Sequence, residues 1–214
     1  GVKVMVTGPT AINIDISTKL GDALPLYLLV VVGIAVLLLM LVFRSLLVPL
    51  KAVLGFLLSV VATLGIVVFV FQQGHLGGLV LLPTAAPVVS FLPLMMVGIL
   101  FGLAMDYEVF LVTRMREAHA RGLEPVEAVR AGFSDSAPVV AAAATIMFSV
   151  FASYVVASDL VTKEMAFSLA IGVGVDALLV RMTLVPAAMA LLGRTAWWLP
   201  RWLGRVLPRI ELEG

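Results

Sequence analysis

The sequence predicts an all-α membrane protein built as a bundle of five membrane-spanning helices. Of its 214 residues, 62% are hydrophobic and only 13% are charged, against roughly 25% charged residues in soluble domains. The mean hydropathy is +1.17. The second observation is a series of long uncharged runs separated by charged turns, because a helix needs about 20 apolar residues to cross the hydrocarbon core of a bilayer.

Five long apolar runs succeed one another along the chain, and the first, second and fourth contain no charged residue. The first is opened by Asp22 and closed by Arg44, and the second comes after a tight turn that carries Pro49. The fourth is rich in alanine and small hydroxyl residues, and the fifth contains two charged residues. The predicted spans are residues 23–43, 52–71, 91–113, 136–158 and 165–192.

Residues 1–22 precede the first span and have a different pattern. Apolar and polar residues alternate within residues 2–6 and 12–16, which is typical of short strands. We therefore expect this segment to lie outside the membrane as the end of a folded domain. Because the chain starts in the middle of that pattern and without a methionine, we expect it to be a fragment of a longer protein.

Lysine and arginine are distributed unequally between the two sides of the predicted bundle. Ten lie in residues 44–51, 114–135 and 193–214, whereas three lie on the opposite side. Since cytoplasmic loops carry the excess of positive charge, we expect the N-terminus outside and the C-terminus in the cytoplasm. A short helix opened by Pro125 would lie along the inner interface or form a solvated linker. The cytoplasmic tail, residues 193–214, would lie at the same interface through Trp197, Trp198, Arg201, Trp202, Arg205 and Arg209.

Composition also argues against several classes of function. The net charge is +1 and the basic residues are spread over loops, so no nucleic-acid partner is indicated. The chain has no cysteine, and its histidines, His75 and His119, are far apart in sequence. We therefore predict no metal site, no cofactor and no catalytic residues of an enzyme.

The third span contains the most informative residues, Asp106, Tyr107 and Glu108. Asp106 precedes Arg114 by eight residues, or about 12 Å along a helix, which places it near the middle of the bilayer. A charge at that depth costs about 2.5–3.5 kcal/mol on insertion scales, and such residues usually face a bundle interior and serve ion or proton pathways. The alternative is a structural hydrogen bond to a neighbouring hydroxyl. Glu108 points to another side of the helix and would reach toward the headgroups.

Two small-residue stripes accompany the acids of the third and fifth spans. Gly98 and Gly102 precede Asp106 at intervals of four residues, and Ser168 and Gly172 precede Asp176 in the same way. Small residues let a neighbouring helix approach closely in lipid, so we predict that each acid lies on a packed face. Asp176 and Arg181 form either an ion pair within one helix or, because a spacing of five is poor for contact, bonds to different helices.

Several segments together resemble one family of membrane transporters. The segments are FGLAMDYEVFLVTRMRE, VDALLVRMTLVPAAMALLG and WWLPRWL, and they are similar to the second half of transporters of the MMPL (mycobacterial membrane protein large) family within the RND superfamily. The resemblance covers nearly the whole chain. It implies that residues 1–22 end an extracytoplasmic α/β porter domain and that the five spans form one RND-type repeat in a bacterial plasma membrane.

The resemblance also implies a function and the residues that carry it. Members are proton-driven exporters of lipids and other hydrophobic molecules, with protons as the coupling ion, and Asp106 with Tyr107 matches the Asp-Tyr pair of their proton relay. Asp176 and Arg181 match the acid and base on the last helix, Arg114 closes the Asp-Tyr helix, and Asp22 leads from the porter domain into the first span. The implied partners are membrane lipids, a hydrophobic substrate and an N-terminal half that carries a facing Asp-Tyr helix.

Two other readings remain open at this point. An intramembrane aspartyl protease also needs two aspartates on different helices, which Asp106 and Asp176 would supply, although the local order DY and the pattern GVGVD differ from the YD and GxGD of such proteases. A five-helix lipid-binding module that resembles a sterol-sensing domain would have the same architecture without transport.

Overall fold

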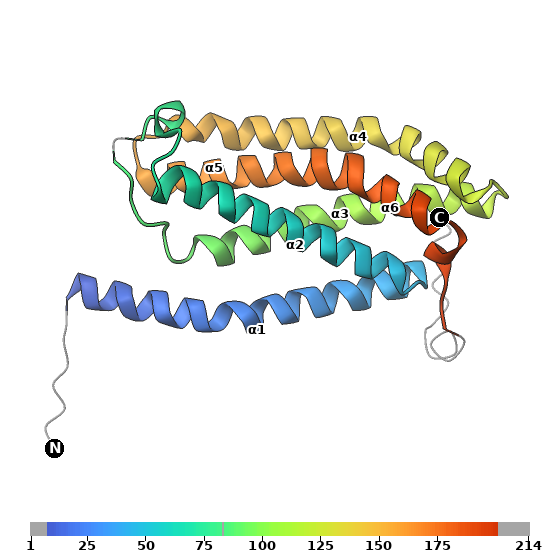
Figure 1. Ribbon diagram of the computed structural model, residues 1–214, viewed down its shortest axis with the longest axis horizontal. Coiled ribbons are helices and arrows are strands. Elements are labelled where there is room, and N and C mark those ends of the chain that lie inside the picture. The colour runs from blue at the N-terminus through green and yellow to red at the C-terminus, as the bar shows by residue number, and fades with distance from the viewer. Residues whose placement is uncertain (1–7, 83, 201–214) are drawn as a thin grey trace, which may run out of the picture.

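Five helical rods lie side by side in the computed structural model (Figure 1), which describes residues 8–82 and 84–200. The rods contain α1 (Pro9–Phe43), α2 (Leu47–Val67), α3 (Leu92–Ala120), α4 (Pro125–Ser153) and α5 (Leu160–Gly174). Each of the five is long and apolar enough to cross a membrane. The predicted all-α five-helix bundle is confirmed, and the described residues contain no strand.

Two of the rods contain π-helical turns. The second rod ends in η1 (Val68–Gln72), and the fifth continues from α5 through η4 (Val175–Leu184) into α6 (Val185–Leu192). Three short 3₁₀ segments complete the chain: η2 (Gly77–Val80), η3 (Tyr154–Val156) and η5 (Gly193–Trp197). We call the end of the bundle with the connections at 44–46, 121–124 and 193–198 the basic end.

α3 has the most central position, since it lies against α1, α2, α4 and α5. Its buried residues join two apolar clusters, one around Phe56 and Leu100 and one around Phe43 and Met115. α1 lies along the edge of the bundle (Figure 1). Only 17% of its apolar window is buried, against 39% for α2 and for α3, so most of α1 is available to lipid or to another polypeptide.

The predicted short strand at residues 12–16 is wrong, because α1 already begins at Pro9. Proline is suited to the first helical turn, where its missing N–H is not needed. The isoleucines at positions 12, 14 and 16 are 45–60% exposed, so no partner strand covers them in the described residues. The other alternating segment, residues 2–6, lies outside the described residues.

The predicted separate helix after Pro125 is also wrong, because these residues form the first turns of α4. α3 continues past Arg114 to Ala120 in the same way. Val129 is 7% exposed and packs inside the bundle, which favours one continuous helix over an interfacial one. Of the tail residues, Trp197 and Trp198 lie at the basic end, and Arg201, Trp202, Arg205 and Arg209 lie outside the described residues.

α3 and α4 approach each other most closely at Gly132. A Cβ atom added there would lie 2.5 Å from the backbone nitrogen and 2.6 Å from the Cα of Met115. Backbone cannot yield as the end of a flexible side chain can, so only glycine fits at this contact.

We predict that Gly132→Ala lowers the stability of the protein in detergent by about 1–3 kcal/mol, the usual cost of overpacking. Thermal unfolding monitored by circular dichroism measures the effect. Gly65→Ala is the matched control, because its Cβ meets nothing within 4 Å and alanine favours a helix by up to about 1 kcal/mol. Equal stability of the two variants would contradict the described contact.

Candidate functional site

Asp106 and Tyr107 lie in the second half of α3 and point to different sides of it. Asp106 is exposed on the surface of the five-helix bundle. No hydrogen bond or ion pair joins it to another residue in the described part of the chain. Tyr107 is half-buried, and its ring lies 5.7 Å from the guanidinium carbon of Arg181. The two neighbours diverge because successive residues of an α-helix are about 100° apart.

The face of α3 that carries Asp106 is open in this chain. A Cβ at Gly98 would lie 2.6 Å from the hydroxyl oxygen of Tyr27 on α1, whereas one at Gly102 would meet nothing within 4 Å. The prediction that this face packs within the bundle is therefore wrong at Gly102 and Asp106. The reason is geometric, since the neighbouring helices α1, α2, α4 and α5 lie against other parts of α3.

Glu108, in contrast, is deeply buried. Its side chain is 2% exposed, forms an ion pair with Lys51 of α2, and has its Oε2 3.6 Å from Nη1 of Arg181. The expectation that Glu108 reaches toward the headgroups is wrong. The side chain of Glu108 points away from that of Asp106 and into the bundle, where it contacts Lys51.

Asp176 and Arg181 form a direct ion pair within the fifth rod, with 2.6 Å between Oδ2 of Asp176 and Nε of Arg181. In an α-helix, residues five apart point about 140° away from each other. Both residues lie in η4, a π-helix, whose wider turn with i→i+5 hydrogen bonds places such residues nearly above one another. Because Arg181 also faces Glu108, both expected arrangements occur: a pair within the helix and a contact to another helix.

These contacts join into what we call the buried ion chain, Lys51, Glu108, Arg181 and Asp176. The charges alternate in sign along it, and each side chain is at most 9% exposed. Ser59 of α2 extends it by donating a hydrogen bond of 3.1 Å to Oδ1 of Asp176. Loss of one member would leave a buried charge without its partner, which is strongly destabilising. The buried ion chain therefore fixes α2, α3 and the fifth rod relative to one another.

The buried ion chain reaches the Asp-Tyr pair through the ring of Tyr107, which Arg181 contacts. One polar atom of the buried ion chain, Nη1 of Arg181, has no hydrogen-bond partner in the described residues. Asp106 and Asp176 are not hydrogen-bonded to each other there, and Asp176 is engaged by Arg181 and Ser59. The arrangement therefore differs from the proton-sharing aspartate pair of an aspartyl protease.

The remaining predicted residues have separate positions. Arg114 is half-exposed, forms a 3.1 Å ion pair with Glu117 and lies over the ring of Phe110. Asp22 is exposed on the first half of α1. Gly172 allows a close contact, because a Cβ there would lie 2.7 Å from the side chain of Leu100 on α3.

Lys51 and Ser59 are site residues that reasoning from the sequence misses. In sequence, Lys51 groups with the charged turn at 44–51, and Ser59 belongs to a stripe of small residues at four-residue spacing, Gly55, Ser59 and Thr63. One signal could have identified the lysine: it lies within the apolar helix, four residues after the helix start at Leu47, where a charge needs a partner.

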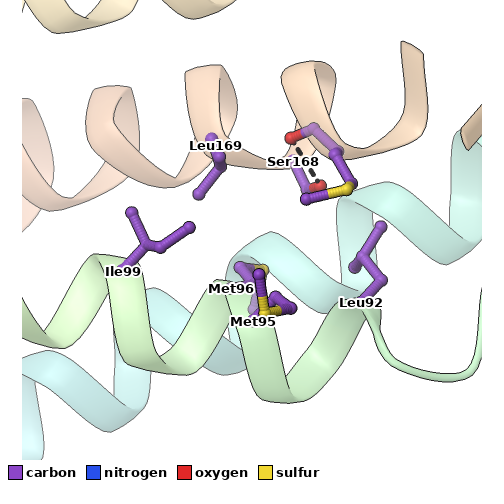
Figure 2. Close-up of a pocket in the computed structure, with 7 residues that line it drawn as sticks. Leu92, Met95, Met96, Ile99, Ser168 and Leu169 are labelled. Atoms are coloured by element: carbon purple, nitrogen blue, oxygen red, sulfur yellow. Dashed lines mark hydrogen bonds between the residues drawn. The ribbon is translucent and has the colours of Figure 1, made fainter. Parts of the chain in front are cut away.

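α3 and α5 enclose a small cavity near the end opposite the basic end, shown in Figure 2. Methionines and aliphatic residues form most of its wall, and Ser168 donates a hydrogen bond of 3.1 Å to the carbonyl oxygen of Met165. Its volume is about 10 Å³, which is the size of one water molecule. The cavity is therefore too small for a hydrophobic cargo.

The sequence of this chain matches a known family over nearly its whole length. The family model described as MMPL family matches residues 1–209. The chain belongs to the MMPL family. Together with the five apolar helices, this membership identifies a multi-pass membrane protein. Two of its relatives are named for transport, one as an uptake protein and one as an exporter.

Individual MMPL relatives are similar to this chain over nearly its full length. Membrane protein YdfJ of Bacillus subtilis is 51% identical over 100% of the chain. The heme uptake protein MmpL11 of Mycobacterium tuberculosis is 40% identical over 99%, and the trehalose monomycolate exporter MmpL3 of Mycolicibacterium smegmatis is 38% identical over 99%. The chain covers 30%, 22% and 21% of these three relatives, respectively.

We predict that Arg181→Met destabilises the protein by about 3–5 kcal/mol, because it leaves Asp176 buried without its cation. The double variant Asp176→Leu with Arg181→Met should recover most of that loss, since the pair of Lys51 and Glu108 remains neutral. Denaturant unfolding in mild detergent measures both. Arg114→Met is the control and should change stability by less than about 1 kcal/mol, as an exposed pair does. A double variant no more stable than the single one would contradict the described pairing of Asp176 with Arg181.

Proposed function

We propose that this chain supplies one half of a proton-driven transporter of lipids or other hydrophobic molecules, with Asp106 as the group that carries the proton. The observation that carries the proposal is the position of Asp106, a carboxylate in the middle of a predicted span, on an open face and without a partner in the described residues. Three other carboxylates of the spans are buried and engaged: Glu108 and Asp176 belong to the buried ion chain, and Glu164 accepts a 3.1 Å hydrogen bond from the backbone of Val89.

The open face of α3 needs a cover in the membrane, because an ionised carboxylate facing lipid is unfavourable by several kcal/mol. We propose that the cover is the N-terminal half of the transporter, with a facing Asp-Tyr helix. Gly102 beside Asp106 has no neighbour within 4 Å, so a second helix can approach the backbone closely there. The small share of α1 that is buried is consistent with a further partner surface.

In this mechanism Asp106 alternates between charged and neutral forms. Tyr107 forms no hydrogen bond with Asp106 in the described residues, and its ring lies against Arg181, so it links the helical turn that carries Asp106 to the buried ion chain. The buried ion chain keeps Tyr107 and the fifth rod in place while the charge changes. Each proton that crosses contributes about 2.3 kcal/mol per 100 mV of membrane potential, which can bias a rigid-body movement of one half against the other.

The same proposal assigns roles to three further parts of the chain. The basic end, which contains Arg44 and Arg194, would face the cytoplasm because positive loops do so. Arg114 would mark that edge of α3. Movement would pass outward through α1 and Asp22 to the porter domain.

The names of the relatives support transport without fixing the cargo. One is named a trehalose monomycolate exporter and another a heme uptake protein, so neither a single substrate nor a single direction can be assigned from them. A hydrophobic molecule is the class that we propose, as the resemblance to the lipid exporters of the MMPL family implies.

We predict that Asp106→Asn in the full-length protein abolishes proton-coupled transport while the protein still inserts and folds. Proteoliposomes with an imposed pH gradient would be loaded with a fluorescent NBD-labelled phosphatidylethanolamine as the hydrophobic probe, and probe movement and proton flux would be recorded together. Glu117→Gln, an exposed change on the same helix, is the control and should retain both activities.

Retained gradient-driven movement of the probe in Asp106→Asn would contradict the proposal. The rival function, a five-helix lipid-binding module, predicts a different result: the unaltered protein would bind the probe, yet an imposed gradient would drive neither proton flux nor probe movement.

A further inference from the structure

A second polar site lies at the end of the bundle opposite the basic end. A cavity of about 260 Å³ that is open to the surface lies between the connection after η2 and the start of α5, and Lys163, Thr84 and Ser158 contribute polar groups to its wall. We call it the Lys163 cavity. It shares no residue with the buried ion chain and does not include Asp106, so the inference below does not rest on the proposed transport function.

Lys163 is a buried cation without an anion. The residue is 6% exposed, and its ammonium group donates one hydrogen bond of 2.9 Å to the carbonyl oxygen of Leu81. No carboxylate of the described residues lies within ion-pair distance of it. A buried ammonium is unfavourable unless its charge is compensated, and two of its three N–H donors remain for another acceptor.

Other donors surround the same space. Thr84 and Ser158 line the cavity, and their hydroxyl groups form no hydrogen bond within the described residues. Lys163 itself belongs to the first turns of α5. The cavity therefore presents an ammonium and two hydroxyls to whatever occupies it.

Two acidic residues lie nearby in sequence, and both are otherwise engaged. Asp159 is exposed and caps α5, accepting hydrogen bonds of 2.8 Å from the backbone and side chain of Thr162. The backbone hydrogen bond from Thr162 holds the pKa of Asp159 below its ordinary value, so this carboxylate stays ionised and cannot donate to an anion. Glu164 points elsewhere and accepts a 3.1 Å hydrogen bond from the backbone of Val89.

We infer that the Lys163 cavity binds a phosphate group, with Lys163 as its main anchor. A phosphate has enough acceptor oxygens for the ammonium and both hydroxyls at once. The rim is apolar, since the wall residues Leu81 and Val156 are 66% and 70% exposed. An apolar rim beside a cationic pocket at the end of a membrane bundle fits the headgroup of a phospholipid, with its glycerol and first methylenes against the rim.

Native mass spectrometry of the purified full-length protein in neutral detergent, titrated with phosphatidylglycerol, tests this inference. Lys163→Gln should raise the apparent Kd at least about tenfold, the effect of losing one charge-assisted hydrogen bond. Lys163→Arg should retain most of the affinity. Lys19→Gln is the matched control, because Lys19 is an exposed lysine on the first half of α1. This variant should bind phosphatidylglycerol with the same apparent Kd as the unaltered protein.

Further measurements identify the source of the phosphate and can overturn the inference. If inorganic phosphate binds with the same dependence on Lys163 and displaces the lipid, the site takes a free anion; if it does not, the lipid headgroup is the ligand. Equal phosphatidylglycerol binding by the unaltered protein and Lys163→Gln would refute the site, as would equal binding of diacylglycerol, which lacks phosphate. Should Lys163→Gln fail to fold, Thr84→Val with Ser158→Ala keeps the lysine, and unchanged affinity there would also refute it.

Discussion

The buried ion chain is the interaction that determines how the helices of this protein fit together. Lys51, Glu108, Arg181 and Asp176 come from three separate helical elements, and each is buried where an unpaired charge would be strongly unfavourable. Apolar packing alone allows helices in lipid to slide and rotate with little cost, because lipid tails are as apolar as leucine. Alternating charges allow few arrangements, so they set the register of α2, α3 and η4.

That constraint explains why α3 carries its acids on two different sides. Glu108 is turned inward and neutralised by Lys51, which leaves Asp106 on the outward face beside Gly102, where no described residue of this chain covers it. The side of α3 that carries Glu108 is therefore fixed by ion pairs, and the side that carries Asp106 is open to contact with another helix. Tyr107 lies between these two sides, with its ring against Arg181. We propose that a change in the charge of Asp106 affects the buried ion chain through Tyr107.

Much of the fold is predictable from the sequence, because uncharged runs of membrane length determine the five helices directly. The ends of the helices cannot be predicted in this way. α1 and α4 include segments whose alternating pattern or charge suggests strands or linkers. At the site, the positions of Asp106 and Asp176 within spans are evident. The partner of Glu108 is not evident, because Lys51 directly precedes the uncharged run and reads in the sequence as part of the charged turn before it. The pair of Asp176 and Arg181 requires a π-helix, which the residue spacing alone does not reveal.

The buried ion chain neutralises Glu108 and Asp176, and buried Glu164 accepts a hydrogen bond from the backbone of Val89. Asp106 has no such partner in the described residues, so we expect it to be the carboxylate of the spans that takes up a proton. Infrared difference spectroscopy of the full-length protein in membranes, recorded on acidification, can observe this uptake through the carbonyl band of protonated carboxyl groups. Asp106→Asn should remove a band that Asp176→Asn, Glu108→Gln and Glu164→Gln leave in place. A band that persists in Asp106→Asn, or that disappears in Glu108→Gln alone, would show that another carboxylate takes up the proton.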